Sequence, residues 1–247
     1  TLLWGVVSDI HSNREAFEGV VERLKAQGAE GWICCGDIVG YGSEPNPVLD
    51  VLRGLPNMNA VRGNHDLAVL GRMDISWFNE AARAAVEFTQ ATISPENLAW
   101  LKELPPRIES GSFTVVHGSP RNPAEEYLVT VQQFHDNCTY YKTSPCFVGH
   151  SHLPMAFFMK EPVSYVDHGP LAPGQVIPIP KATRIVINPG SVGQPRDHEP
   201  RASCGLYDDE KRTFTLHRVK YDVEAVQAKI RAAGLPEFLA MRLAYGQ

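Results

Sequence analysis

The sequence predicts a mixed α/β (α+β) fold, in which two β-sheets form a sandwich and helices cover its outer faces. In residues 1–62, apolar runs typical of buried strands alternate with helical patterns. From residue 155 onward, short strand patterns follow one another until two helical segments close the chain. The chain has 247 residues, 43% of them hydrophobic, and neither an internal repeat nor a long linker divides it. We therefore expect residues 1–247 to form a single domain.

The first part of the chain predicts a mainly parallel, well-buried sheet. Strand patterns occupy residues 2–8, 31–35 and 58–62, and helical patterns lie at 12–24 and 45–55. Strands that alternate with helices in this way pair in parallel, because each helix carries the chain back across the sheet. The first helix is expected to begin with a capping box formed by Ser12 and Glu15.

Residues 67–104 predict a helical insertion beside the sheet. They contain two helical patterns, at 78–90 and 94–104, and the second opens with Ser94 as cap and Pro95 in its first turn. We expect this insertion to cover a site.

The second part of the chain begins with two predicted strands, at 113–117 and 145–150, that flank a helix at 131–141. From residue 155 onward, the sequence predicts short strands that are largely antiparallel. Further strand patterns occupy 155–160, 163–167, 175–179, 184–190, 203–208 and 214–219, and helical patterns occupy 223–233 and 236–244.

Composition excludes several classes of protein. The net charge is −5, so no extended nucleic-acid surface is expected. No apolar run is long enough to span a membrane, and the N-terminal residues are too soon polar for a secretory signal. The five cysteines are odd in number and show no CxxC spacing, which indicates neither a disulfide framework nor a zinc finger. We expect Cys34 and Cys35 to be buried residues of a protein in the reducing cytoplasm.

Two histidines at residues 150 and 152, in the stretch FVGHSHLP, give the first functional indication. In an extended backbone, side chains two residues apart point to the same side, about 7 Å from each other along the strand. This spacing suits two imidazoles that bind either one metal ion or two neighbouring ions.

Further polar residues follow other apolar strands. Each has an ordinary explanation as a helix cap, a turn residue or a strand-end histidine, but open α/β sheets place their sites at the carboxyl ends of strands. The residues that collect at these ends are Asp9, His11, Asp37, Asn64, His65, Asp66, His117, His150 and His152. The other histidines, His135, His168, His198 and His217, lack this context.

The chemistry of this set favours transition metals. Carboxylates, imidazoles and an amide oxygen, without a thiolate, suit Mn²⁺, Fe²⁺, Zn²⁺, Co²⁺ or Ni²⁺ better than calcium, and we favour manganese. Two dications about 3.5–4 Å apart need a bridging ligand, which a carboxylate can supply. Such a pair would leave a net positive site on an acidic protein, which would attract phosphate.

The motifs DIH, GD, GNHD, H and GHSH, between residues 9 and 152, resemble the signature of the calcineurin-like metallophosphoesterase superfamily. The segments GDIVGYG, HGSP and NPGSVGQPRD resemble its small bacterial and archaeal phosphodiesterase branch. The resemblance implies a four-layer αββα sandwich of two mixed sheets flanked by helices. It implies two divalent metal ions, the first bound by Asp9, His11 and His152 and the second by Asn64, His117 and His150, with Asp37 bridging both.

The resemblance also implies a mechanism, in which a metal-held water or hydroxide attacks phosphorus in line with the departing alkoxide. His65 would protonate the leaving group or stabilise the phosphoryl oxygens, and we expect Asp66 to orient its ring. Arg196 is a candidate for bidentate contact with a substrate phosphate, or a solvated loop charge. Asn64 is a second candidate for substrate binding. Ser191 and Asn13 lie near the site by motif position, although Asn13 also suits the helix start.

Several readings of the function remain open. The leading one is hydrolysis of a small phosphodiester; the alternatives are a phosphomonoesterase, a hydrolase of nucleoside polyphosphates, and a scaffold of the same fold without catalysis. The residues after Gly36 and Asp37 include no arginine, which argues against a typical phosphoprotein phosphatase. Trp77 and Phe78 either form a pocket wall for a base or another aromatic leaving group, or pack the inserted helices onto the body. The physiological substrate, with nucleotides among the candidates, and the oligomeric state are not determined by the sequence.

Overall fold

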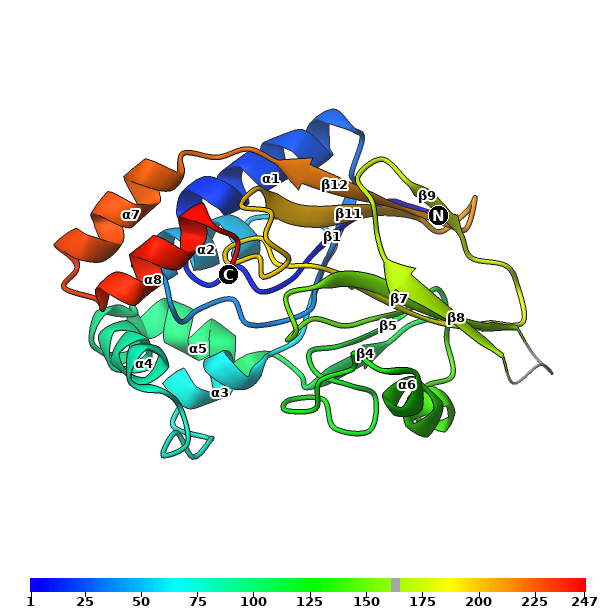
Figure 1. Cartoon of the computed structure of the whole chain (residues 1–247), viewed down its shortest axis with the longest axis horizontal. Coiled ribbons are helices and arrows are strands. Elements are labelled where there is room, and N and C mark those ends of the chain that lie inside the picture. Colours follow the sequence, from blue (N-terminus) through cyan, green and yellow to red (C-terminus); the bar gives the residue numbers. More distant parts are fainter. Residues whose placement is uncertain (161–164) are drawn as a thin grey trace.

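The computed structural model describes residues 1–160 and 165–247. Within them the chain forms two six-stranded sheets (Figure 1). The strands are β1 (Leu3–Val7), β2 (Gly31–Cys34), β3 (Met58–Ala60), β4 (Arg107–Glu109), β5 (Thr114–Val116), β6 (Cys146–Phe147), β7 (Pro154–Lys160), β8 (Val166–Pro170), β9 (Val176–Pro178), β10 (Thr183–Pro189), β11 (Ala202–Asp208) and β12 (Thr213–Val219). The helices are α1 (Arg14–Ala26), α2 (Pro45–Arg53), α3 (Asn64–Val69), α4 (Glu80–Thr92), α5 (Pro95–Glu103), α6 (Val131–Asn137), α7 (Val223–Ala232) and α8 (Glu237–Met241), with 3₁₀ turns η1 (Cys138–Tyr140) and η2 (Arg242–Ala244).

Both sheets are mixed. One has the strand order β3-β2-β1-β11-β12-β9, and the other has the order β4-β5-β6-β10-β7-β8. The predicted parallel pairing of the first three strands is confirmed, since β1 pairs with β2 and β2 with β3 in parallel. From residue 155 onward the strands are largely antiparallel, as predicted. The exception is β10, which pairs in parallel with β6, and β6 also pairs in parallel with β5. The carboxyl ends of the parallel strands β1, β2 and β3 therefore all point to the same end of the first sheet.

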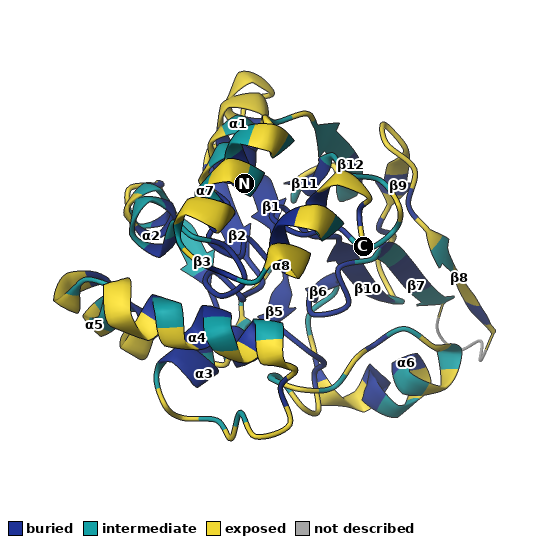
Figure 2. Cartoon of the chain, turned by 60° about the vertical axis from the view of Figure 1, so that its left-hand side comes forward, coloured by how far each residue is buried: buried dark blue, intermediate teal, exposed yellow. Residues whose placement is uncertain are grey.

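Three hydrophobic clusters separate four layers. The first lies between the first sheet and the helices on its outer face, including α1, α2 and α7. The second lies between the two sheets, and the third lies between the second sheet and α6. The central strands β1, β2, β5, β6 and β11 are accordingly buried on both sides, whereas β4, β8 and β9 carry exposed residues and the helices expose their outward faces (Figure 2). The αββα sandwich implied by the motifs is confirmed.

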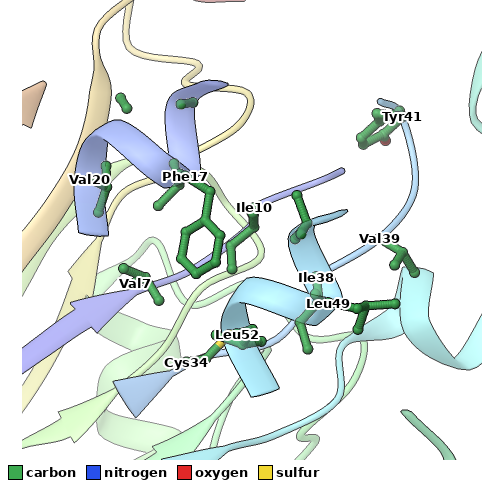
Figure 3. Close-up of a cluster of buried hydrophobic side chains, with 14 of the residues drawn as sticks. Val7, Ile10, Phe17, Val20, Cys34, Ile38, Val39, Tyr41, Leu49 and Leu52 are labelled. Carbon is green, nitrogen blue, oxygen red and sulfur yellow. The ribbon is translucent and has the colours of Figure 1, made fainter. Parts of the chain in front are cut away.

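The alternation of strand side chains distributes neighbouring residues between these clusters. Val7 and Cys34 face the helices, whereas Val6 and Cys35 face the other sheet. Figure 3 shows Val7 and Cys34 in the first cluster with Phe17 of α1. The prediction that Cys34 and Cys35 are plain buried residues is confirmed, and they belong to different layers.

The helix starts agree with the sequence at one position and differ at another. Ser94 caps α5, and its hydroxyl accepts a hydrogen bond from the amide of Asn97, as predicted. The cap of α1 is Asn13, whose side chain accepts from the amide of Ala16, so the predicted capping box of Ser12 and Glu15 is wrong. The reason is that Ser12 has a φ of 53°, in the left-handed region, and belongs to the loop before the helix.

The helical segment after β3 begins at α3, slightly before the expected residue 67, and continues through α4 and α5. The strand expected at 163–167 begins as β8 at Val166; residues 163 and 164 lie outside the described residues. Among the described residues, no helix combines the length and the apolar character that crossing a membrane requires.

Candidate metal centre

Loops at the ends of five strands carry the predicted ligands into one place. Asp9 and His11 follow β1, Asp37 follows β2, Asn64 begins α3 after β3, His117 follows β5, and His150 and His152 follow β6. All of these side chains are buried. The predicted ligands therefore lie close together in the fold, although they are up to 143 residues apart in the sequence.

The backbone at these positions is unusual. Five of the candidate ligands have φ in the left-handed region, which side chains with a Cβ rarely adopt: Asp9 (51°), His11 (49°), Asp37 (51°), His150 (66°) and His152 (61°). The expectation that His150 and His152 point the same way from an extended strand is therefore wrong, because β6 ends at Phe147. Such conformations cost free energy and cluster at functional sites.

The first group of possible ligands consists of Asp9, His11, Asp37 and His152. One potential ligand atom from each lies within 4.8 Å of the others. The Nε2 atoms of His11 and His152 are 3.2 Å apart, and His152 Nε2 is 3.2 Å from Asp9 Oδ1. Asp37 Oδ2 is 3.6 Å from His11 Nε2.

The second group consists of Asp37, His117 and His150, again within 4.8 Å of one another. His117 Nε2 is 3.3 Å from Asp37 Oδ2 and 3.0 Å from the Oδ1 atom of Asn64. Asp37 thus belongs to both groups, whereas His150 and His152 belong to different ones. This is the division that the motifs implied.

Each of the four imidazoles has its outward nitrogen on a backbone carbonyl. His11 Nδ1 is 3.0 Å from the carbonyl of Val39, His117 Nδ1 is 2.8 Å from that of Cys35, and His152 Nδ1 is 2.6 Å from that of Gln194. His150 uses Nε2 instead, at 3.1 Å from the carbonyl of Glu125. Because a carbonyl can only accept, these outward nitrogens carry a proton, which leaves a lone pair on the inward nitrogen of each ring that is neutral.

This arrangement fits a cation. With both Nδ1 atoms donating outward, the Nε2 atoms of His11 and His152 face each other with no proton between them. Two facing lone pairs repel unless a positive charge lies between them. The donor set of carboxylate and imidazole suits borderline divalent ions.

The titration of these groups agrees with a metal-binding role. Burial would raise the pKa of Asp9, but the neighbouring His152 ring holds that pKa below its ordinary value, so the carboxylate is charged. Burial lowers the pKa of His11 and of His152, and lowers that of His150 to about 3, so these rings are neutral at pH 7. His117 is the exception, because the charge of Asp37 outweighs its burial and raises its pKa to about 9.

A comparison with known proteins identifies the group to which this centre belongs. A family model of the calcineurin-like phosphoesterase superfamily domain matches residues 2–212. The chain belongs to this superfamily. It is accordingly a metal-dependent phosphoester hydrolase, and the resemblance in the motifs is confirmed.

Individual relatives cover the whole chain. A metallophosphoesterase from Sphaerobacter thermophilus has a structure with a TM-score of 0.88 and 39% identity, covering 100% of this chain and 99% of that one. An uncharacterized protein from Methanocaldococcus jannaschii is 37% identical over 247 residues, covering 98% of this chain and 97% of that protein. A hypothetical protein from Pyrococcus horikoshii shares the fold, with a TM-score of 0.79, 21% identity and coverage of 100% and 99%.

His65 of this phosphoesterase lies beside the two ligand groups. Its amide donates to Asp37 Oδ1 at 2.9 Å, and its ring packs against Tyr41 and Phe78, with centroids 4.4 and 5.1 Å away. Burial lowers the pKa of His65 to about 4. Its Nδ1 atom has no hydrogen-bond partner among the described residues.

Asp66 does not orient the His65 ring as expected. Its Oδ1 atom accepts from the amides of Ile38 and Val39, at 3.0 and 3.2 Å, and its Oδ2 atom accepts from the amide of Gly63 at 2.8 Å. Adjacent residues on a helix point about 100° apart, so the carboxylate of Asp66 turns away from the ring beside it. Asp66 holds the loop after Asp37 against the start of α3.

Ser191 and Asn13 make hydrogen bonds to the loops that carry the ligands, not to the ligand side chains. Ser191 Oγ donates to the carbonyl of Asp9 at 2.8 Å, and it accepts from the amide of Gln194 at 2.8 Å. Asn13 donates to the carbonyl of Gly193 at 3.0 Å while it caps α1. Both side chains hold the loop of residues 191–194 against the loop after β1.

A cavity of about 440 Å³ opens over Asp37, Asn64, His65, His150 and His152. Arg196, Trp77 and Phe78 line it, so these candidates lie at the site. Phe78 is buried and Trp77 is 60% exposed, so the alternative in which both only pack the helices onto the body is wrong for Trp77. The inserted helical segment therefore forms one wall of the cavity.

Seven lining residues were missed from the sequence. They are Tyr41, Asn79, Ala82, Glu125, Tyr127, Phe238 and Arg242. Tyr41 lies in the segment GDIVGYG, so its position in a motif could have identified it as a site residue. Tyr127 lies several residues after the HGSP segment, so no motif includes it. Phe238 and Arg242 come from the C-terminal helices, where no motif marks them.

Proposed function

We propose that this phosphoesterase uses two divalent metal ions to hydrolyse phosphodiesters. The observation that carries the proposal is the division of the buried ligands into two groups that share Asp37. Asp9, His11 and His152 would hold one ion, Asn64, His117 and His150 the other, and Asp37 both. When bound, the two ions would supply Lewis-acid activation of water and of the phosphoryl oxygens.

The residues around this centre have distinct roles in the proposal. The imidazoles are already oriented by backbone carbonyls, so little ordering is needed when ions bind. His65 lines the cavity next to the Asp37 carboxylate and is placed to hold or protonate the leaving-group oxygen. Arg196 lines the same cavity and is placed to bind an anionic group of the substrate.

A diester is favoured over a monoester because of the walls of the cavity. A diester carries an organic group on each side of phosphorus, and both need space and apolar contact. The cavity of about 440 Å³ has aromatic side chains from different chain segments, with Trp77 and Phe78 on one and Tyr127 on another. Pockets of this size bind small organic ligands.

Other parts of the proposal concern the ions, the domain and the compartment. Manganese is the ion that we favour for this nitrogen and oxygen donor set. We infer that residues 1–247 act as one catalytic domain, because the cavity is lined by residues from 37 to 242. We keep the cytoplasm as the expected compartment, since Cys34, Cys35, Cys146 and Cys204 are buried thiols.

The test compares two chromogenic substrates, bis(p-nitrophenyl) phosphate and p-nitrophenyl phosphate, each with added Mn²⁺. We expect faster cleavage of the diester. Asp37→Asn, purified in parallel, is expected to lose on the order of 1,000-fold or more of this activity, since one ligand shared by both ions is weakened.

The other outcomes are informative. Faster cleavage of the monoester would replace the diesterase by a phosphomonoesterase. Activity that survives in Asp37→Asn would come from a contaminating hydrolase. Silence on both substrates with Mn²⁺, Fe²⁺, Zn²⁺, Co²⁺ and Ni²⁺ would contradict the proposal and favour a scaffold without catalysis.

A further inference from the structure

Two arginines from different parts of the chain meet over one tyrosine ring at the cavity. The guanidinium carbon of Arg196 is 5.8 Å from the centroid of the Tyr41 ring, and that of Arg242 is 6.0 Å from the same centroid. Both arginines are partly buried and line the cavity over the metal centre. In Figures 1 and 2, α8, which leads into Arg242, lies between α7 and α4 at the end of the molecule that carries the inserted helices.

Neither charge has an Asp or Glu side chain as a partner among the described residues. Neither Arg196 nor Arg242 forms an ion pair there, and the neighbouring acid, Asp197, is paired with Arg218 instead. Glu125 also lines the cavity, but it is exposed and makes no ion pair with either arginine. A pair of like charges in a partly buried place is unfavourable unless an anion binds between them.

Most of the guanidinium donors face no protein acceptor. Arg196 donates from Nε and Nη2 to Gln194 Oε1, at 3.3 and 2.9 Å, and from Nη2 to the Tyr41 hydroxyl at 3.5 Å. Arg242 donates from Nε to the main-chain oxygen of Gln247. The Nη groups of Arg242 make no hydrogen bond within the described part of the chain. Burial and the charge of Arg196 lower the pKa of Arg242 to about 10, so both side chains remain charged at pH 7.

The position of this pair relative to the metal centre limits what it can bind. The Tyr41 ring lies 4.4 Å from the His65 ring and 4.6 Å from the His11 ring, centroid to centroid. The Tyr41 ring therefore contacts both the two arginines and the rings of the metal centre. An anion held by both arginines is close to the scissile phosphate, but it is a separate group.

We propose that Arg196 and Arg242 form a second anion subsite, which binds a phosphate group of the substrate other than the one that is cleaved. The substrate class is then a phosphodiester whose organic part carries a further phosphate, with its apolar part against Phe78 and Trp77. This inference rests on the proposed function, because it takes the metal centre as the place of cleavage.

The first experiment uses two substrates with the same scissile bond. The 5′-p-nitrophenyl ester of thymidine 5′-phosphate is compared with the same ester carrying an additional 3′-phosphate. We expect kcat/KM of the wild-type enzyme with Mn²⁺ to be about tenfold or more higher for the second compound, because charge-assisted hydrogen bonds to the added phosphate stabilise its complex.

A binding measurement separates this inference from the proposed function. Isothermal titration calorimetry of the wild-type holoenzyme compares thymidine 3′,5′-bisphosphate with thymidine 5′-monophosphate, with phosphate release monitored to confirm that the ligands stay intact. We expect the bisphosphate to bind about tenfold or more tightly. If this preference is found but neither ester is cleaved, the proposed function fails and the subsite stands.

The variants assign the preference to the two arginines. In Arg242→Gln we expect the ratio of the two dissociation constants to fall to about threefold or less. Arg242→Lys should give a ratio between those of Arg242→Gln and the wild type, because lysine keeps the charge but cannot form the two parallel hydrogen bonds of a guanidinium group. Arg196→Gln is expected to act similarly and replaces Arg242→Gln if that variant does not fold. Arg23→Gln, an exposed arginine on α1 outside the cavity, removes the same charge and should leave the ratio unchanged.

Two results would overturn the subsite. One is equal binding, or no measurable binding, of the bisphosphate and the monophosphate to the wild-type holoenzyme. The other is a preference that persists in both Arg242→Gln and Arg196→Gln, which would place the added phosphate elsewhere.

Discussion

The metal centre and the cavity wall opposite it are built in different ways. At the centre, each imidazole is buried and has its outward nitrogen on a backbone carbonyl. On the wall, Trp77 and Phe238 are 60% and 56% exposed, and Arg196 and Arg242 are only partly buried. The centre comes from loops between strands, whereas the wall comes from the inserted segment, the C-terminal helices and the loop at residue 196.

This difference separates chemistry from selectivity. Groups that act on phosphorus must keep a fixed geometry. Buried imidazoles provide it, because one ring nitrogen is held by a backbone carbonyl and the other points into the centre. Groups that recognise the organic part of a substrate can be exposed and independent of one another. We therefore expect substitutions at the centre to change kcat and metal content, and substitutions on the wall to change KM for particular substrates.

His65 tests whether a residue of the centre can act in catalysis without binding metal. We expect His65→Gln to lower kcat on bis(p-nitrophenyl) phosphate by about 10²–10⁴-fold, because a general acid or a phosphoryl contact is lost. Metal content, measured by inductively coupled plasma mass spectrometry, should equal that of the wild type. His135→Gln, on the exposed face of α6, is the control. Loss of metal together with activity would assign His65 to the ligand set instead.

Gly149 tests the rigidity of the centre. A Cβ atom at this position would lie 2.0 Å from Ser8 Oγ and 2.7 Å from Asp9 Oδ2, so Gly149→Ala must displace the Asp9 carboxylate. We expect a loss of about 1–3 kcal/mol in the free energy of unfolding, by urea denaturation, and about tenfold weaker metal binding.

Gly111→Ala is the matched control for this substitution, since nothing lies within 4 Å of a Cβ atom there. Equal stability and equal metal affinity of the two variants would show that the Asp9 loop is free to shift, contrary to the rigid centre described above.

Trp77 tests the wall. We expect Trp77→Ala to raise KM for bis(p-nitrophenyl) phosphate by about 2–10-fold, the loss of one aromatic contact, with kcat unchanged. Methyl p-nitrophenyl phosphate has the same leaving group and a smaller second substituent, so its KM should change less than that of the bis-ester. A fall in kcat of the same size for both substrates would move Trp77 from the wall to the centre.

Glu126 gives the smallest expected effect, which depends on pH. It supports the loop of Tyr127 through contacts with Arg121, Ser119 and Asn137, and although burial opposes the shift, these partners lower the pKa of Glu126 to about 2. A lowered pKa in the folded state stabilises the protein above the unfolded pKa of about 4.3, and this stabilisation is lost as the pH falls toward 2.

The Tm difference between the wild type and Glu126→Gln should therefore be greatest at neutral pH and shrink below pH 4.3. Differential scanning calorimetry at pH 7, 5 and 3.5 measures it. A difference that is independent of pH would mean that the charge of Glu126 contributes nothing to the stability of the loop.

Strands and candidate ligands could be predicted where both are marked by residues that are close in the sequence. Each apolar run followed by Asp or His predicted a strand and a candidate ligand at its end. The geometry within the loops was not predictable. Left-handed φ values at His150 and His152 are rare for such residues, so an extended strand was the natural expectation, and it was wrong.

Residues that act through packing were also not predictable. Asp66 follows His65 directly, yet neighbouring positions on α3 point in different directions, and its carboxylate binds backbone amides of another loop. Arg242 approaches Arg196 only because the C-terminal helices fold back to the cavity. No pattern in the C-terminal segment marks a contact with a residue 46 positions earlier in the chain.

The carbonyl partners of the four imidazoles have a consequence for how this protein tolerates mutation. Val39, Cys35, Gln194 and Glu125 contribute their main chain, not their side chains, to the orientation of the rings. Every amino acid has a carbonyl oxygen, so no substitution at these four positions removes the acceptor itself. Substitutions at these four positions therefore leave the orientation of the metal ligands unchanged, as long as the backbone conformation of the loops is preserved.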